Sequence, residues 1–177
     1  MRQSAFVNGT LRSRWCIVWP VVVVAPQLRD AVPGDAEELS SIFLRARARA
    51  MPWLANPHDE HSTRWWMQHV ILTEQQVRVA DDGSRLLGFA AVAGAWLEHL
   101  YVDPEHQGRG VGRALLEDVK RLRSGGLRLH AFTRNAPARR FYEAAGFVLV
   151  DQSDGHSNEE QEPDCTYAWT PRSTRTR

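Results

Sequence analysis

Residues Leu97–Leu116, LEHLYVDPEHQGRGVGRALL, decide how this chain of 177 residues folds. Apolar, β-branched and aromatic residues predict a strand over Trp96–Val102, and Pro104 marks its end because proline has no N–H to give to a sheet ladder. Glycines then alternate with other residues over 107–112, where they let the backbone turn tightly. Apolar residues follow at helical spacing. The stretch therefore predicts a strand, a short polar loop, a glycine-rich turn and a helix.

The glycine-rich turn is a predicted phosphate site. A helix that begins at such a turn presents unpaired N–H groups and a partial positive charge, and both favour a bound phosphate. Gly108, Gly110 and Gly112 leave these N–H groups without a Cβ in front of them. Arg109 and Arg113 add full positive charge. We therefore expect a pyrophosphate to lie on this turn.

Two common phosphate-binding motifs do not fit the turn. A P-loop ends in Gly-Lys-Ser/Thr, so that the lysine reaches the γ-phosphate and the hydroxyl holds magnesium, whereas Gly112 is followed by Arg113 and Ala114. A dinucleotide-binding fold needs a third glycine at the position of Arg113 and an acidic residue at the end of the next strand. The next predicted strand, Leu127–Thr133, contains no carboxylate. The sequence therefore disfavours both kinds of nucleotide.

What matches instead is the acyl-CoA loop of the GNAT superfamily of N-acetyltransferases. In that family, a strand that ends in Val-x-Pro is followed by Gln/Arg-x-x-Gly-x-Gly/Ala. Val102, Pro104, Gln107, Gly110 and Gly112 fill this pattern in order. The chain therefore resembles a family whose members bind acyl-CoA at this loop.

A second segment supports the resemblance independently. Asn135–Phe147, NAPARRFYEAAGF, resembles the family's Asn-x-x-Ala-x-x-Phe-Tyr-x-x-x-Gly-Phe segment. Two motifs in the family's order and separation are stronger evidence than one glycine motif. The resemblance covers roughly Leu28–Thr170 and implies an α/β fold. This fold has a mixed, mostly antiparallel central sheet of about seven strands, flanked by about four helices, with strands splayed at the acyl-CoA site.

The chain around these motifs divides into three parts. We expect 1–26 to be an N-terminal extension, 27–170 the acetyltransferase domain and 171–177 a basic C-terminal tail. The apolar run Trp15–Ala25 follows arginines and superficially resembles a signal peptide, but it is shorter than the roughly 20 residues that cross a bilayer. It fits an appendage that adds Val21–Ala25 as an edge strand, or a start site assigned too far upstream.

Local patterns place further elements inside the domain. Asp35 is expected as the N-cap of a first helix, whose arginines form a solvated face near its C-terminus. His61–Leu72 predicts a second helix, and Asp-Gly at 82–83 predicts a hairpin. Asn135 is expected to cap a later helix. The resemblance implies that the region of the first two helices borders the acceptor pocket, so three tryptophans there either line this pocket or fill the core: Trp53, Trp65 and Trp66.

Composition restricts the class of protein. The chain is 43% hydrophobic and 24% charged with a net charge of +1, which is typical of a soluble globular domain. We therefore expect no dedicated nucleic-acid or membrane-surface binding, and a homodimer is possible. Cys16 and Cys165 are too few for a disulfide framework and favour a reducing compartment, in agreement with a cytoplasmic acetyl-CoA donor. No His, Cys or carboxylate pattern completes a metal site, so we expect no metal.

The resemblance also implies roles for individual residues. An acceptor amine attacks acetyl-CoA directly in a ternary complex, and a general base removes a proton from the amine. Glu98 is the candidate base, and His99, which strand alternation points to the opposite face unless a bulge intervenes, is the reserve. A backbone N–H at Leu100 or Val102 stabilises the oxyanion, and Tyr142 protonates the leaving thiolate. The residues expected to bind acetyl-CoA are Leu100, Tyr101, Val102, Gln107, Gly108, Arg109, Gly110, Val111, Gly112, Arg113, Asn135 and Arg139.

The acceptor is predicted from charge. Asp151–Asp164 carries six carboxylates and no Lys or Arg, and in the family the loop between the last two strands reaches over the acceptor site. Because like charges focus the potential and attract a cation, we expect a primary amine of a small cationic molecule. A solvated acidic loop is the alternative explanation of this run. Two other functions are open: acetylation of a peptide or protein amine, and a non-catalytic acyl-CoA-binding regulatory module.

Overall fold

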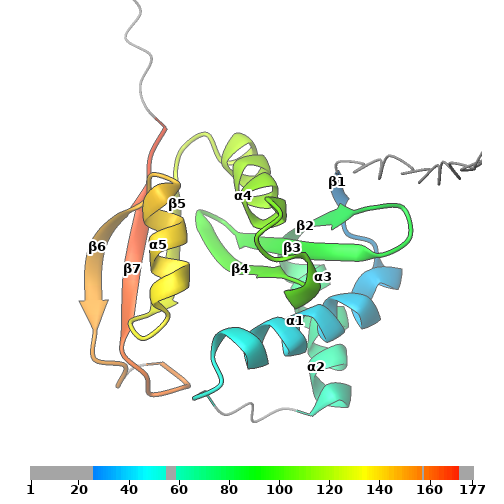
Figure 1. The fold of residues 1–177 in the computed structure, drawn as a ribbon, viewed down its shortest axis with the longest axis horizontal. Coiled ribbons are helices and arrows are strands. Elements are labelled where there is room, and N and C mark those ends of the chain that lie inside the picture. Colours follow the sequence, from blue (N-terminus) through cyan, green and yellow to red (C-terminus); the bar gives the residue numbers. More distant parts are fainter. Residues whose placement is uncertain (1–25, 55–58, 157, 172–177) are drawn as a thin grey trace, which may run out of the picture.

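The computed structural model describes residues 26–54, 59–156 and 158–171, and this part of the chain forms a seven-stranded sheet (Figure 1). The strands are β1 (Gln27–Asp30), β2 (Gln76–Asp81), β3 (Leu86–Ala93), β4 (Trp96–Val102), β5 (Leu127–Phe132), β6 (Val148–Ser153) and β7 (Asp164–Trp169). Their order across the sheet is β1-β2-β3-β4-β5-β7-β6. All neighbouring strands are antiparallel except β4 and β5, which are parallel. The predicted mixed, mostly antiparallel sheet is therefore confirmed.

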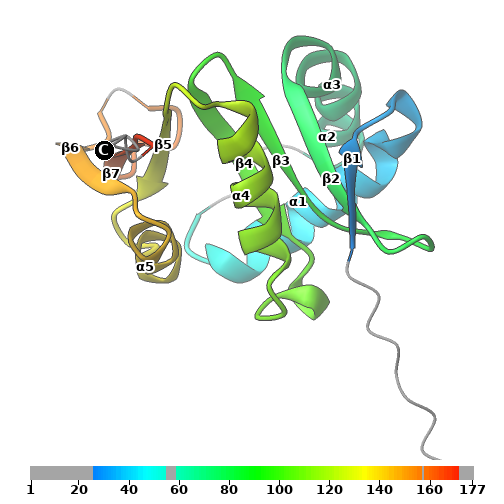
Figure 2. The same cartoon turned by 90° about the horizontal axis from the view of Figure 1, so that it is seen from above.

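Four helical segments pack on the sheet. They are α1 (Ala36–Ala50), α2 (Glu60–Trp66) with its continuation, α4 (Val111–Leu122) and α5 (Ala136–Ala144). After α2 the chain widens into a π-helical segment, Met67–Ile71, before the short α3 (Leu72–Glu74), so the predicted second helix is present with an altered middle. Figure 2 shows the β5–β7 half of the sheet, with α5 beside it, set apart from the β1–β4 half. The two halves pair at a single position, Trp96 of β4 with Arg128 of β5.

Buried side chains form two clusters, one on each face of the sheet. On one face, α1 and the α2–α3 segment pack on β2 and β3. The helical segments contribute Leu39, Ile42, Phe43, Met67 and Ile71, and the strands contribute Val77, Val79 and Phe89. On the other face, α4 packs on β3–β5 and β7. The helix contributes Val111, Leu115, Leu116 and Val119, and the strands contribute Leu97, Leu127, Leu129 and Tyr167. Each fully buried aliphatic side chain contributes roughly 1.5–3 kcal/mol. These two clusters therefore hold α1 and α4 firmly on opposite sides of β4.

Two predictions about helix ends turned out differently. Asp35 does not bond the helix it precedes; its carboxylate instead accepts hydrogen bonds from Val32 N and Arg29 Nη1, both at 2.8 Å. Nor do the α1 arginines form a uniformly solvated face, because the Arg47 side chain is only 12% exposed. By contrast, Asn135 accepts a hydrogen bond from Ala138 N at 3.2 Å, and the predicted cap of α5 is confirmed.

The hairpin predicted from Asp-Gly is also confirmed, since β2 and β3 pair antiparallel around 82–85. Cys165 is fully buried and carries a free thiol. The predictions for Cys16, for the edge strand Val21–Ala25 and for most of the C-terminal tail lie outside the described residues.

Candidate active site

β4 and β5 lie side by side only at their first residues. The one paired position joins Trp96 and Arg128, next to a hydrogen bond from Arg128 N to Ala95 O at 2.8 Å. Beyond it, β4 stays paired with β3, and β5 stays paired with β7. The parted strands border a cavity of about 1210 Å³. The strand splay predicted from the sequence is therefore confirmed.

A β-bulge at Glu98 sets which side chains of β4 face the cavity. Ala91 of β3 pairs with His99, whereas the next residue, Val92, pairs with Leu97, so Glu98 is the extra residue. Such a bulge redirects the side chains around it. Glu98 is exposed and lines the cavity.

The same bulge turns His99 away from the cavity. Its ring lies edge-on to Phe43 and Trp66, with ring centroids 6.2 and 5.3 Å apart. Burial, together with the nearby Arg47 guanidinium, lowers the pKa of His99 to about 4. A histidine with this pKa is neutral and weakly basic at pH 7. His99 therefore packs against α1 and does not line the cavity.

The glycine-rich turn opens onto the cavity. Gly108 and Gly110 have φ angles of +74° and +87°, a region that favours glycine, and both are exposed. A Cβ added at either would have nothing within 4 Å, so the space in front of the turn is free. Gln107 Nε2 donates to Val102 O at 3.1 Å and fixes the turn to the end of β4. Gln107, Gly108, Gly110 and Gly112 all line the cavity.

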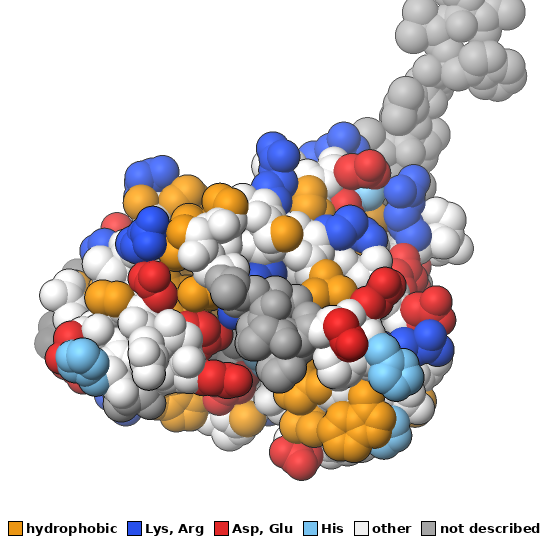
Figure 3. Space-filling view, turned by 90° about the horizontal axis from the view of Figure 1, so that it is seen from below, with side chains coloured by type: hydrophobic (Ala, Val, Ile, Leu, Met, Phe, Trp, Pro, Cys, Tyr) orange, Lys and Arg blue, Asp and Glu red, His pale blue; other side chains and the backbone are white. Residues whose placement is uncertain are grey.

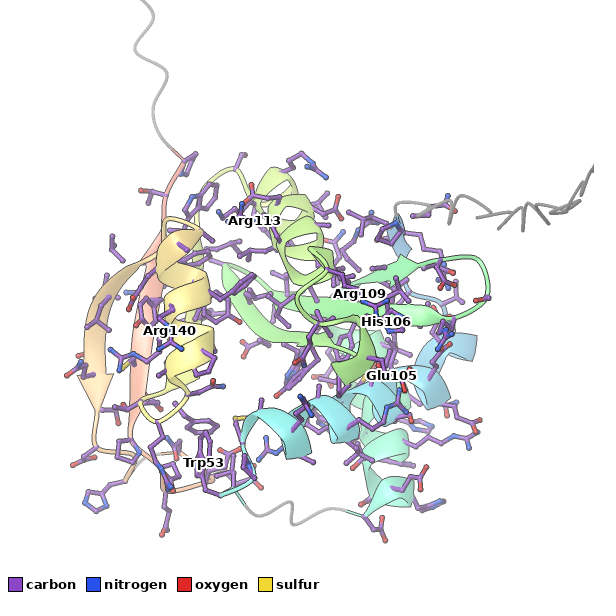
Figure 4. All side chains as sticks on the ribbon, viewed as in Figure 1. Trp53, Glu105, His106, Arg109, Arg113 and Arg140 are labelled. Carbon is purple, nitrogen blue, oxygen red and sulfur yellow. The ribbon has the colours of Figure 1, made fainter. Side chains whose placement is uncertain are left out.

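The two arginines of this turn lie differently. Figure 4 shows Arg113 directed from α4 toward α5, and Arg113 lines the cavity. Arg109 lies on the side of the turn away from α5 (Figure 4), outside the residues that line the cavity. Val111 is 4% exposed and belongs to the core under α4. Only Arg113 therefore adds side-chain charge inside the cavity near the turn.

Helix α5 supplies the opposite wall. Asn135 and Tyr142 line the cavity, and burial raises the pKa of the Tyr142 phenol, which therefore stays protonated in neutral solution. Arg139 is turned away: its Nε donates to the Tyr167 hydroxyl at 3.1 Å and its Nη1 to Thr133 O at 3.4 Å. Of the predicted residues on α5, two therefore reach the cavity and one serves internal contacts.

Charge is divided between the two ends of the cavity. Arg113 is the only Lys or Arg among the described residues that line it, and it lies beside the glycine-rich turn. Away from the turn, four carboxylates line the cavity: Glu98, Asp151, Glu160 and Asp164. Figure 3 shows the molecule from below, with several acidic side chains exposed on this face among basic and apolar ones. One end therefore suits an anion and the other a cation.

Comparisons with known proteins agree with this geometry. Residues 73–149 match the model of the acetyltransferase (GNAT) domain. An uncharacterized N-acetyltransferase of Escherichia coli (strain K12), YafP, is 30% identical over 149 residues, which cover 81% of this chain and 89% of YafP. The chain belongs to the GNAT family of N-acetyltransferases.

Two further proteins resemble this chain over most of their length. Peptidyl-lysine N-acetyltransferase YiaC of Escherichia coli (strain K12) is 34% identical over 131 residues, which cover 70% of this chain and 84% of YiaC. The solution structure of apo-form YjaB from Escherichia coli has a TM-score of 0.69 at 23% identity, and the match covers 82% of this chain and 98% of YjaB. This GNAT enzyme is therefore an acyltransferase that uses acetyl-CoA.

The residues present in this GNAT enzyme fit acetyl-CoA. An anionic pyrophosphate needs free N–H groups and open space, and the exposed glycine turn at the start of α4 offers both. The pantetheine arm needs an unpaired strand edge, and β4 has one beyond Trp96. Leu100, Tyr101 and Val102 line the cavity along this edge.

The acidic run is partly neutralised by contacts within the enzyme. Arg47 of α1 forms an ion pair with Glu160 at 3.0 Å, and Arg134 approaches Glu162 at 3.4 Å. These contacts hold the β6–β7 loop against α1 and against the start of α5. The loop is therefore part of the cavity wall and is not only a solvated acidic segment.

None of the three tryptophans predicted for the acceptor wall or the core lines the cavity. Trp65 is 56% exposed and stacks on the His69 ring. Trp66 packs against Phe43, with ring centroids 5.4 Å apart. Trp53 lies under the Arg134 guanidinium at 4.9 Å, so this contact joins the loop after α1 to the loop between β5 and α5 (Figure 4).

The sequence did not single out Arg47 or His130. Arg47 does not line the cavity but pairs with Glu160, which does. It is one of several similar arginines on one helix, and nothing local distinguishes it. His130 lies on β5 between the buried Leu129 and Ala131 and lines the cavity. Strand alternation alone places its side chain on the opposite face from these two residues, so the pattern could have revealed it.

Within 26–54, 59–156 and 158–171, no group of three or more His, Cys, Asp or Glu residues is arranged to hold a metal ion. No helix in the same ranges is both long and apolar enough to cross a membrane.

Proposed function

We propose that this enzyme transfers acetyl from acetyl-CoA to the primary amine of a small cationic molecule. The division of charge in the cavity carries the proposal: Arg113 and the glycine turn lie at one end, and four carboxylates lie at the other. A tetra-anionic donor is repelled from the acidic end, whereas a protonated amine is attracted to it. The two substrates therefore enter from opposite ends and meet at the split between β4 and β5.

The chemical steps follow from the groups along the split. Glu98 accepts one of the two protons that leave the acceptor nitrogen, directly or through water. The amine lone pair attacks the thioester carbonyl, and an N–H of Leu100 or Val102 on the unpaired edge of β4 binds the oxyanion. When the C–S bond breaks, the Tyr142 hydroxyl protonates the thiolate. No step requires a metal, and because acetyl-CoA is a cytoplasmic metabolite, we place the reaction in the cytoplasm.

The lysine side chain of a protein is a second candidate acceptor. YiaC, which is 34% identical over 131 residues, is a peptidyl-lysine N-acetyltransferase by name. A lysine ammonium would be attracted by the same carboxylates as a small amine. The two candidates differ in whether the flanking peptide contributes to binding.

An acceptor panel tests the proposal. Thiol release from acetyl-CoA would be measured with a polyamine, an aminoglycoside, a lysine peptide and an acidic amino acid as acceptors. We expect the polyamine or the aminoglycoside to have the highest kcat/KM. A preference for the lysine peptide would favour the second candidate, and a preference for the acidic amino acid would refute the role of the carboxylates.

A matched pair of variants isolates the charge. Asp151, on β6, lines the cavity, whereas Asp154, just after the end of β6, does not. Asp151→Asn should raise KM for a cationic amine several-fold and leave KM for acetyl-CoA unchanged. Asp154→Asn removes the same charge outside the cavity and should change neither constant. Equal effects of both variants would indicate only a diffuse influence of net charge.

A further inference from the structure

His130 lies at the split between the strands. It follows Arg128, the last residue of β5 that pairs with β4, by two residues. Glu98 follows Trp96, the paired residue of β4, by the same number. Both side chains line the cavity, one from each side of the split. An acceptor nitrogen held at this point would therefore lie between a carboxylate and an imidazole.

The contacts of His130 fix one edge and one face of its ring. Nδ1 lies 3.2 Å from the Thr166 hydroxyl and 3.9 Å from the Asp164 carboxylate, both on β7. The ring stacks on Trp96, with centroids 4.7 Å apart and an interplanar angle of 11°. Nε2 has no hydrogen-bond partner in the part of the chain that the structure describes. The ring is therefore held with one nitrogen occupied and the other available.

The reaction needs a second group that accepts a proton from the amine nitrogen. A protonated amine loses one proton before it can attack, and the attack product, with N⁺H₂ and an oxyanion on the former carbonyl carbon, loses another. One proton reaches the thiolate through Tyr142, and the other must leave to solvent. Imidazole is a stronger base than a carboxylate near neutral pH. Glu98 alone therefore leaves one of the two protons without a suitable acceptor.

We propose that His130 is a catalytic base, whose Nε2 takes the ammonium proton before attack, and that Asp164 and Thr166 position its ring. This inference rests on the proposed function. The first proton moves from nitrogen to Nε2, and the N–C bond forms as the carbonyl π bond opens. As the C–S bond breaks, Glu98 takes the second proton and the Tyr142 hydroxyl protonates the thiolate; the Glu98 proton then returns to the Tyr142 oxygen through solvent. Because the His130 side chain is 53% exposed, the imidazolium returns its proton to water.

The charged groups around His130 support this role. Asp164 on β7 is 14% exposed, and its carboxylate lies 3.9 Å from Nδ1. Glu98 lines the same cavity, and the Arg128 guanidinium lies 5.4 Å from the Trp96 ring centroid. Among the described residues, Asp164 is the one carboxylate within 4.0 Å of a ring nitrogen of His130.

The decisive variant is His130→Phe in the full chain, since phenylalanine keeps the stack on Trp96 but has no nitrogen. With the best amine of the acceptor panel, we expect kcat to fall by about 100-fold or more, the range of general-base catalysis. KM for acetyl-CoA should stay within about twofold. His130→Ala should lose as much of its kcat. Added imidazole should restore part of the activity of His130→Ala, but it should restore none in His130→Phe, whose ring fills the space.

Asp164→Asn tests positioning. Without the carboxylate the ring is held less firmly, so kcat should fall while KM for acetyl-CoA stays within about twofold, and the acidic limb of the kcat/KM profile should vanish in His130→Phe. A structural role alone would produce neither this split between kcat and KM nor the loss of the limb. If the parent enzyme acetylates an amine but His130→Phe keeps its kcat and its acidic limb, the inference is wrong and the proposed function stands. If the parent acetylates no amine, the proposed function fails first.

Discussion

Replacing Tyr142 with Phe should slow acetyl transfer and leave acetyl-CoA binding intact. The Tyr142 side chain lines the cavity, and burial raises the pKa of its phenol. The raised pKa keeps the proton-donating form populated through neutral and mildly alkaline pH. A general acid contributes about 10²–10⁴-fold to a rate, which corresponds to about 3–5 kcal/mol of activation free energy. We therefore expect kcat to fall at least 100-fold.

The fold should tolerate this change. The Tyr142 ring lies edge-on to Phe141 and Phe147, with centroids 5.2 and 5.8 Å apart, and phenylalanine keeps both contacts. The free energy of unfolding should change by less than about 1 kcal/mol. Thiol-release kinetics would give kcat and KM for acetyl-CoA, and urea unfolding would check the fold. A kcat within threefold of the parent value, in a folded variant, would remove Tyr142 from the mechanism.

Three further changes test other parts of the structure. Lys120 is 7% exposed and its Nζ donates to Ala145 O at 2.6 Å, so Lys120→Met should lose about 1–3 kcal/mol in urea unfolding. Gly110 has φ +87°, so Gly110→Ala should cost about 1–2 kcal/mol and raise KM for acetyl-CoA in thiol-release assays. Burial alone would raise the pKa of Asp103, but hydrogen bonds, chiefly from Arg45, lower it overall. Its stabilisation is therefore present above the unfolded-state pKa and lost as pH falls through the folded-state pKa, and Asp103→Asn should flatten this part of an acid-unfolding curve.

Elements of the fold could be predicted from local patterns where a residue type has a single effect on the backbone. Proline at 104 could end β4, glycines at 108 and 110 could take positive φ, and Asn135 could cap α5, each without reference to the rest of the chain. The glycine turn and the α5 segment each carry their own structural meaning. Their combination in the right order was enough to predict the sheet, its splay and the use of acetyl-CoA.

The site was harder to predict because it depends on contacts between distant residues. Arg47 and Glu160 form an ion pair across 113 positions of sequence, and no helical pattern indicates which arginine of α1 will find a carboxylate. The orientation of His130 depends on the register that places Thr166 opposite it. Such pairings arise only when β5 and β7 come together, so single-sequence patterns carry no information about them.

The bulge at Glu98 illustrates how the core determines the geometry of the site. With regular alternation, Leu97 and Leu100 would lie on opposite faces of β4. With one extra residue between them, both pack on the cluster beneath α4. Removing the bulge would take one leucine out of that cluster, at a cost of roughly 1.5–3 kcal/mol. Hydrophobic burial thus fixes a distortion that leaves Glu98 facing the cavity and His99 packed against α1. The position of the carboxylate in the active site is therefore maintained by two leucines that need not touch either substrate.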